Sequence, residues 1–99
     1  MASQAQQENR KARRVDVALH SRVRHSGFAV APVQIRNLSF YGFRADGTLP
    51  LKHGDYVSID LPNLGLVRAR IAWVKEDRFG AVFSTAIDVR KCVTRAADA

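Results

Sequence analysis

The chain has 99 residues, enough for one domain but too few for two independent hydrophobic cores. Its apolar fraction of 46% and charged fraction of 25% are ordinary for a folded protein and exclude an intrinsically disordered chain. The formal charge is +7, and twelve of the sixteen basic residues are arginine. Such a chain attracts anionic partners, and arginine favours planar, bidentate contacts with phosphate groups or guanine edges.

Cys92 is the only cysteine, which excludes an intramolecular disulfide and a cysteine-based zinc site. The sequence has no run of about 18 apolar residues, and its first nine residues lack the apolar core of a signal peptide. We therefore expect a cytoplasmic protein without membrane insertion. Residues 1–9 are polar and rich in glutamine, so we expect a disordered tail there, followed by a single domain over residues 10–97.

The first regular pattern follows the basic run at residues 10–14. Apolar and polar residues alternate from Val15 to Val23, which is typical of a half-buried strand. A second strand is predicted over residues 28–38, with a change of parity at Pro32 that a bulge or an edge position would explain. A short third strand is predicted over residues 43–45.

The second half of the chain predicts a meander of three strands after a loop rich in glycine and proline. The strands are predicted over residues 57–61, 67–74 and 79–83, joined by turns at residues 62–65 and 76–77. In this pattern Trp73 is in phase with Ala69 and Ile71, so its side chain is predicted to lie in the core together with Phe79 and Phe83.

A different period begins after Ser84. Val89, Cys92, Val93 and Ala96 are spaced i, i+3, i+4 and i+7, which predicts a short C-terminal helix. Six short strands separated by turns indicate an all-β barrel or sandwich, and the helix would cover one end or face of it.

Two segments have the chemistry to hold a nucleotide. The leader contains Arg10-x-x-x-Arg14, whose guanidinium groups can pair with guanine O6 and N7 or with phosphate. The turn Asn37-x-Ser39-x-x-Gly42 offers an amide and a hydroxyl to a base edge, and its glycine allows a positive φ or a close approach of the backbone. In so arginine-rich a chain the first pattern arises readily by chance, so the second supplies most of the specificity.

In this order, before the first strand and at the end of the second, the two segments resemble the motifs of the PilZ domain family, Arg-x-x-x-Arg and Asp/Asn-x-Ser-x-x-Gly. The resemblance continues through residues 51–59, Arg70-Ile-Ala-Trp-Val and Phe79-Gly-Ala-Val-Phe83, and covers roughly residues 9–93. It implies an all-β fold: a six-stranded antiparallel β-barrel with a short C-terminal α-helix and a flexible basic N-terminal leader. It also implies binding of cyclic di-GMP, a bacterial second messenger.

The resemblance also implies which residues contact this ligand. It implies contacts from Arg10 and Arg14 of the leader and from Asn37, Ser39 and Gly42 of the turn. By their positions in the sequence, Arg13 competes with its two neighbours for the ligand, and Tyr41 and Arg44 offer additional contacts. Phe40, beside Tyr41, is predicted to pack into the core. The protein would need no cofactor or metal and would pass the signal to a downstream protein partner.

Two other functions remain open on the sequence. One is a small basic β-barrel that binds single-stranded nucleic acid, which would need solvent-facing aromatic residues along its strands. The other is a PilZ-like adaptor that contacts proteins without binding a nucleotide. An enzyme is not expected, because no nucleophile lies beside a base. His20, His25 and His53 lack the spacing of metal ligands and are interpreted as isolated surface histidines.

Overall fold

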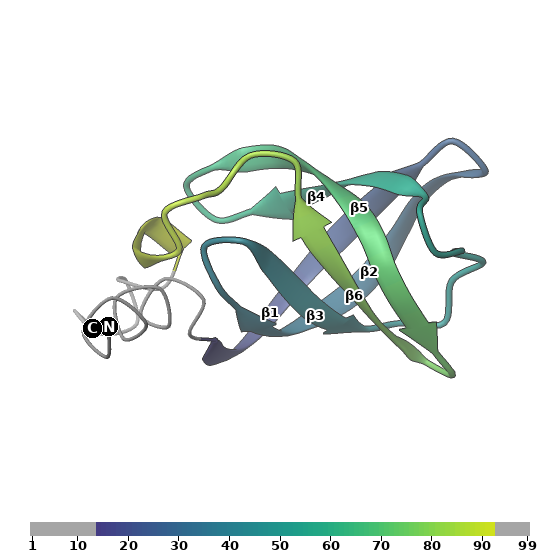
Figure 1. Ribbon diagram of the computed structural model, residues 1–99, viewed down its shortest axis with the longest axis horizontal. Coiled ribbons are helices and arrows are strands. Elements are labelled where there is room, and N and C mark those ends of the chain that lie inside the picture. Colours follow the sequence, from purple (N-terminus) through teal and green to yellow (C-terminus); the bar gives the residue numbers. More distant parts are fainter. Residues whose placement is uncertain (1–13, 93–99) are drawn as a thin grey trace, which may run out of the picture.

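The structure is a computed structural model that describes residues 14–92. Six antiparallel strands close into a barrel in the order β1-β2-β3-β6-β5-β4 (Figure 1). The strands are β1 (Val15–His25), β2 (Phe28–Leu38), β3 (Gly42–Asp46), β4 (Tyr56–Leu61), β5 (Gly65–Lys75) and β6 (Arg78–Phe83). The six-stranded antiparallel barrel is therefore confirmed, and the sandwich is excluded.

The barrel is filled by apolar side chains from all six strands. Phe43 stands edge-on to Phe79, with ring centroids 5.9 Å apart, and its centroid lies 5.6 Å from that of Phe83. The largest fully buried side chains are Phe43, Phe79, Ile35, Leu38, Ile59, Leu61, Ile71 and Val23. Each buried side chain of this size contributes about 1.5–3 kcal/mol to folding. The predicted burial of Phe79 and Phe83 is confirmed.

A bulge in β2 changes which residues face the core. Ile35 aligns with Ala45, but Asn37 aligns with Arg44, so Arg36 is an additional residue opposite β3. After the bulge Leu38 points inward and is fully buried, whereas Asn37 shares the outer side of the wall with Arg44.

The change in side-chain parity that the sequence predicts at Pro32 occurs at another position in β2. Pro32 and Val33 align regularly with Arg22 and Ser21 of β1, and the register shift falls before them, between Phe28 and Ala31. A proline lacks the N–H that a ladder uses, but here it is accommodated without a bulge of its own.

A bulge in β5 explains why Trp73 is not in the core. Ile71 aligns with Ala81, but Trp73 aligns with Gly80, so Ala72 is the additional residue in β5. The indole is consequently turned to the outer face and is 37% exposed. The predicted burial of Trp73 is therefore wrong, because strict alternation does not continue past Ile71.

The barrel closes where β1 meets β4, through the aligned pairs Val23–Ile59 and Arg24–Ser58. We call this junction the seam. Side chains extend the pairing on both sides of it. At one end the hydroxyl of Ser21 donates to the backbone oxygen of Asp60.

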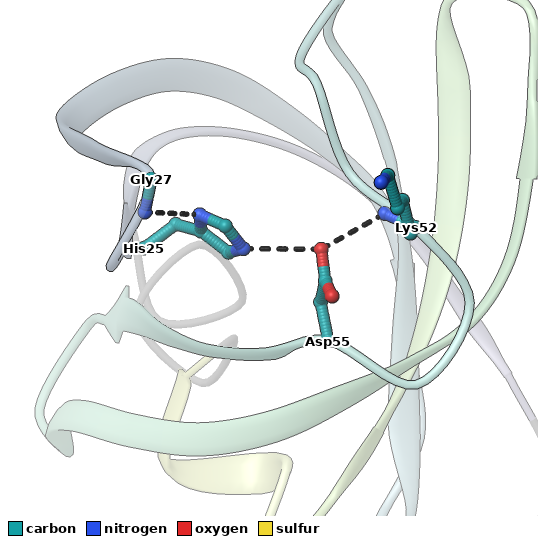
Figure 2. A network of polar contacts seen from close by, with 4 residues as sticks. All are labelled: His25, Gly27, Lys52 and Asp55. Carbon is teal, nitrogen blue, oxygen red and sulfur yellow. Dashed lines mark hydrogen bonds and ion pairs between the residues drawn. The ribbon is translucent and has the colours of Figure 1, made fainter.

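At the other end of the seam, His25 of β1 contacts Asp55, which directly precedes β4 (Figure 2). The N–H of Gly27 donates to His25 Nδ1 at 2.8 Å, so in the neutral ring Nε2 carries the proton and donates to Asp55 Oδ2 at 3.0 Å. The same oxygen accepts the backbone N–H of Lys52 at 2.9 Å. The reading of His25 as an isolated surface histidine is thus wrong: its side chain is 13% exposed and is a connecting element of the fold.

The described part of the C-terminal helix is one turn, from Arg90 to Cys92, at one end of the barrel (Figure 1). Val89 and Cys92 are buried in the core cluster, as the spacing predicted. The remaining predicted helical positions, Val93 and Ala96, lie outside the described residues, as does the tail at residues 1–9. Within residues 14–92 no helix is long and apolar enough to cross a membrane.

The Asp55 contacts make stability depend on pH. The pKa of Asp55 lies below its ordinary value, chiefly because the backbone N–H of Lys52 donates to the carboxylate and further because His25 does. A carboxyl whose pKa is depressed on folding stabilises the fold above its unfolded pKa of about 3.9, and this stabilisation is lost as the pH falls through the folded pKa. Asp55→Asn should therefore lower the melting temperature at neutral pH, and the difference from the wild type should shrink in acid.

Thermal unfolding of both proteins between about pH 7 and about pH 3 measures this difference. Asp60→Asn, an exposed position in β4, is the matched control and should leave the melting temperature close to that of the wild type. A difference between Asp55→Asn and wild type that stays constant into acid would contradict the assignment.

Candidate functional site

The turn between β2 and β3 is built around the hydroxyl of Ser39. Its Oγ accepts the backbone N–H groups of Tyr41 and Gly42, each at 3.2 Å, and the Ser39 N–H donates to the Gly42 oxygen at 2.9 Å. Ser39 is 3% exposed. Its hydrogen-bonding capacity is thus used within the turn, where it sets the backbone path from Asn37 into β3.

Gly42 is required by a close approach to β6. A Cβ added at this position would collide with the backbone oxygen of Ala81, which cannot move without disrupting the ladder. Of the two possible reasons for a glycine here, the structure supports the close approach, since the glycines with positive φ are Gly54 and Gly65.

The two aromatic residues inside the turn lie in different environments. Phe40 is half-buried and packs against the core, as predicted, and its backbone oxygen accepts the N–H of Ile87 at 2.9 Å. Tyr41 is 46% exposed, and its backbone oxygen accepts the N–H of Phe83 at 2.7 Å. The turn is therefore anchored through its backbone, while the ring of Tyr41 remains on the surface.

The structure brings one leader arginine onto the turn motif. Arg14 Nη1 donates to Asn37 Oδ1 at 3.0 Å. Asn37 is 5% exposed, whereas Arg14 is itself exposed to solvent. Arg10 and Arg13, the other predicted leader contacts, lie outside the described residues. Two residues 23 positions apart in sequence, one from each motif, thus meet on the outer wall of the barrel.

Asn37 belongs to a row of outward-facing positions that crosses five strands. The aligned pairs run from Asp16 through Asn37, Arg44 and Gly80 to Trp73. We call this row the clasp face. Arg44 is exposed and makes no ion pair among residues 14–92. Its neighbour Arg36 pairs with Asp46 at 3.6 Å, an exposed contact that contributes little to stability.

Trp73 is the member of the clasp face that alternation along the strand missed. A Cβ at Gly80 would collide with the indole, so the ring lies directly over this glycine, beside Arg44 in the row. The sequence feature that could have predicted this outward position is the pairing of a tryptophan with a glycine in neighbouring strands, because a large ring needs a residue without a side chain beneath it. The clasp face therefore carries the carboxylate of Asp16, the amide of Asn37, the guanidinium of Arg44 and the exposed indole of Trp73, and Arg14 adds a second guanidinium at Asn37.

A model of the PilZ domain matches residues 8–96. The chain belongs to the PilZ domain family. PilZ domains generally bind cyclic di-GMP, and they are binding or adaptor domains, not catalysts. A search of curated proteins gave no match. Among residues 14–92, no group of three His, Cys, Asp or Glu side chains could hold a metal ion.

Ser39→Ala tests the structural role of the hydroxyl in this PilZ domain. The variant leaves the buried N–H of Gly42 and the partly buried N–H of Tyr41 without their acceptor, and an unsatisfied buried donor costs about 1–3 kcal/mol. We expect a loss of that size in the free energy of unfolding, measured by urea denaturation. The matched control is Ser84→Ala, an exposed serine, which should change stability by less than about 0.5 kcal/mol. Equal stability of the two variants would show that the Ser39 hydroxyl does not hold the turn.

Proposed function

We propose that this PilZ domain binds cyclic di-GMP on the clasp face and relays its presence to a partner protein. The observation that supports this most is the hydrogen bond between Arg14 and Asn37, which brings the leader motif and the turn motif to one place. A PilZ domain that binds this dinucleotide needs both motifs at one site. An arginine that occurred in the leader by chance would be solvated and would not be expected to pair with Asn37.

Each group on the clasp face has a role that suits a guanine nucleotide. When the ligand arrives, Arg14 transfers its N–H groups from Asn37 to a guanine edge or a phosphate, both of which form charge-assisted contacts with guanidinium. Asn37 Oδ1 is then free to accept an N–H of the guanine base. Ser39 and Gly42 act indirectly, because they hold the backbone that positions Asn37.

The leader supplies the remaining positive charge. Arg10 and Arg13 would close over the phosphates, and Arg44 would extend the positive face from the barrel side. Ordering the leader costs about 1–2 kcal/mol per residue, which the charge-assisted contacts must offset. Loss of one arginine should therefore reduce affinity strongly, and the ordered leader is what a partner protein would recognise.

Aromatic groups beside the clasp add stacking. Trp73 lies on the same outward row, and Tyr41 lies exposed in the turn. Stacking of a base on an aromatic ring contributes about 1–3 kcal/mol in nucleotide-binding proteins. We assign Trp73 as the primary stacking group, because its ring rests on Gly80 in the outward row.

A second candidate function is binding of single-stranded nucleic acid. It is favoured by the exposure of Trp73 and of Tyr56, which is 53% exposed, since such binding requires aromatic rings on the outer face. Competition between cyclic di-GMP and an oligothymidylate, with the salt dependence of each, separates the two functions. Affinity for the oligonucleotide that exceeds affinity for the dinucleotide would favour the second candidate.

The role of Arg14 is tested with Arg14→Ala. We expect titration calorimetry with cyclic di-GMP to show binding to the wild type and at least about a hundredfold loss in the variant, in keeping with the loss of a charge-assisted pair. The melting temperature should change little, because Arg14 is exposed and removing its side chain opens Asn37 Oδ1 to water, which can replace the lost donor. Arg22→Ala, an exposed arginine of β1, is the matched control and should bind as the wild type does. Undiminished binding of cyclic di-GMP by Arg14→Ala would overturn the proposed site on the clasp face.

Trp73 is the only tryptophan, so its fluorescence reports directly on the clasp face. We expect cyclic di-GMP to quench the emission in a saturable way, with a midpoint equal to the calorimetric one, because a guanine stacks on the indole. Trp73→Phe should bind more weakly than the wild type, and Trp73→Ala more weakly still. Saturable binding by calorimetry without any change in fluorescence would place the ligand away from Trp73.

A further inference from the structure

A second surface with binding chemistry lies at the seam, away from the clasp face. An open hollow of about 360 Å³ is lined there by Arg24, Tyr56, Ser58 and Arg68, among others. In the ring of six strands β4 stands opposite β3, which carries Arg44. On β1 and β5, which both surfaces share, Arg24 lies eight residues from Asp16 and Arg68 lies five residues from Trp73 along the strand. None of the residues assigned to cyclic di-GMP lines this hollow.

Two arginines flank the hollow on neighbouring strands. Arg24 aligns with Ser58, and Ser58 aligns with Arg68, so the three form one outward row across β1, β4 and β5. Adjacent strands are about 4.8 Å apart, which places the two arginine backbones about 10 Å apart with the serine hydroxyl between them. Neither guanidinium makes an ion pair within the part of the chain that the structure describes. A carboxylate seated over Ser58 can therefore contact both.

The two neighbouring outward rows carry apolar side chains together with two further charges, Arg70 beside Tyr56 and Asp60 beside Leu66. Tyr56 is 53% exposed and Leu66 is 56% exposed, and they belong to the rows on either side of Arg68. Val82, 47% exposed, continues the Tyr56 row through Arg70. Exposed aliphatic and aromatic groups beside arginine match the composition of protein interface centres, where tyrosine and arginine are enriched.

We propose that the seam surface, defined by Arg24, Tyr56, Ser58, Leu66 and Arg68, docks an acidic segment of a partner protein that also carries aliphatic side chains. The carboxylate lies between the two arginines, and the aliphatic groups cover Tyr56 and Leu66. A nucleic acid fits less well, because Arg68 already covers one face of the Tyr56 ring at 4.4 Å and a phosphate chain would leave the aliphatic groups in water.

The test uses the full chain labelled with ¹⁵N and a short synthetic peptide of glutamate, leucine, glycine and serine. We expect saturable shifts of the backbone amides of Arg24, Ser58 and Arg68. The same peptide with glutamine in place of every glutamate should bind about tenfold more weakly or worse. Absence of saturable shifts, equal binding of the glutamine peptide, or stronger shifts of these amides by an oligothymidylate would each overturn the proposal.

A double variant, Arg24→Gln with Arg68→Gln, removes both charges and keeps most of the side-chain length. It should lose about tenfold or more in affinity for the acidic peptide, whereas the control pair Arg22→Gln with Arg78→Gln, at exposed positions outside the hollow, should not. The seam variant should bind cyclic di-GMP as the wild type does, so failure here is distinguishable from failure of the clasp. Undiminished binding of the acidic peptide by the seam variant would overturn the proposal.

Discussion

The bulge at Arg36 reverses the side-chain alternation of β2 just before the turn, and the arrangement of the clasp face depends on it. Strict alternation would send Asn37 into the core and Leu38 into water. Burying an amide without a partner costs about 1–3 kcal/mol, and leaving a leucine exposed forgoes about 1.5–3 kcal/mol. One additional residue in the strand avoids both costs. It also places the amide on the outer wall, within reach of Arg14.

A bulge in β5 has the same effect at the opposite end of the clasp face. Its additional residue turns Trp73 outward over Gly80, while Ile71 and Phe79 keep the interior filled. Between the two bulges, β3 and β6 follow a regular ladder that sets the spacing of the row. The functional side chains of the clasp face thus lie on the strands of the barrel wall, and the Ser39 turn fixes the backbone that follows Asn37. Rigid elements of this kind position a site more accurately than a free loop does.

Much of this could be predicted from the sequence, and the failures have two causes. Alternation located all six strands, and the order of two short motifs indicated the family that the match over residues 8–96 establishes. Alternation cannot show where a strand gains a residue, because a bulge preserves the composition and changes only the parity. That is why Trp73 was assigned to the core. The role of His25 was missed for another reason: its partner Asp55 is thirty residues away, and only the closed barrel brings them together.

The proposed binding of cyclic di-GMP and of a partner protein uses two different surfaces, the clasp face and the seam surface on β1, β4 and β5. The central claim is that cyclic di-GMP binds beside Asn37. The most direct measurement is the set of intermolecular nuclear Overhauser effects between the guanine H8 and sugar protons and the labelled protein. We expect contacts with the side-chain amide of Asn37 and with the indole of Trp73. Contacts confined to the seam, at Tyr56 and Arg68, would contradict the account.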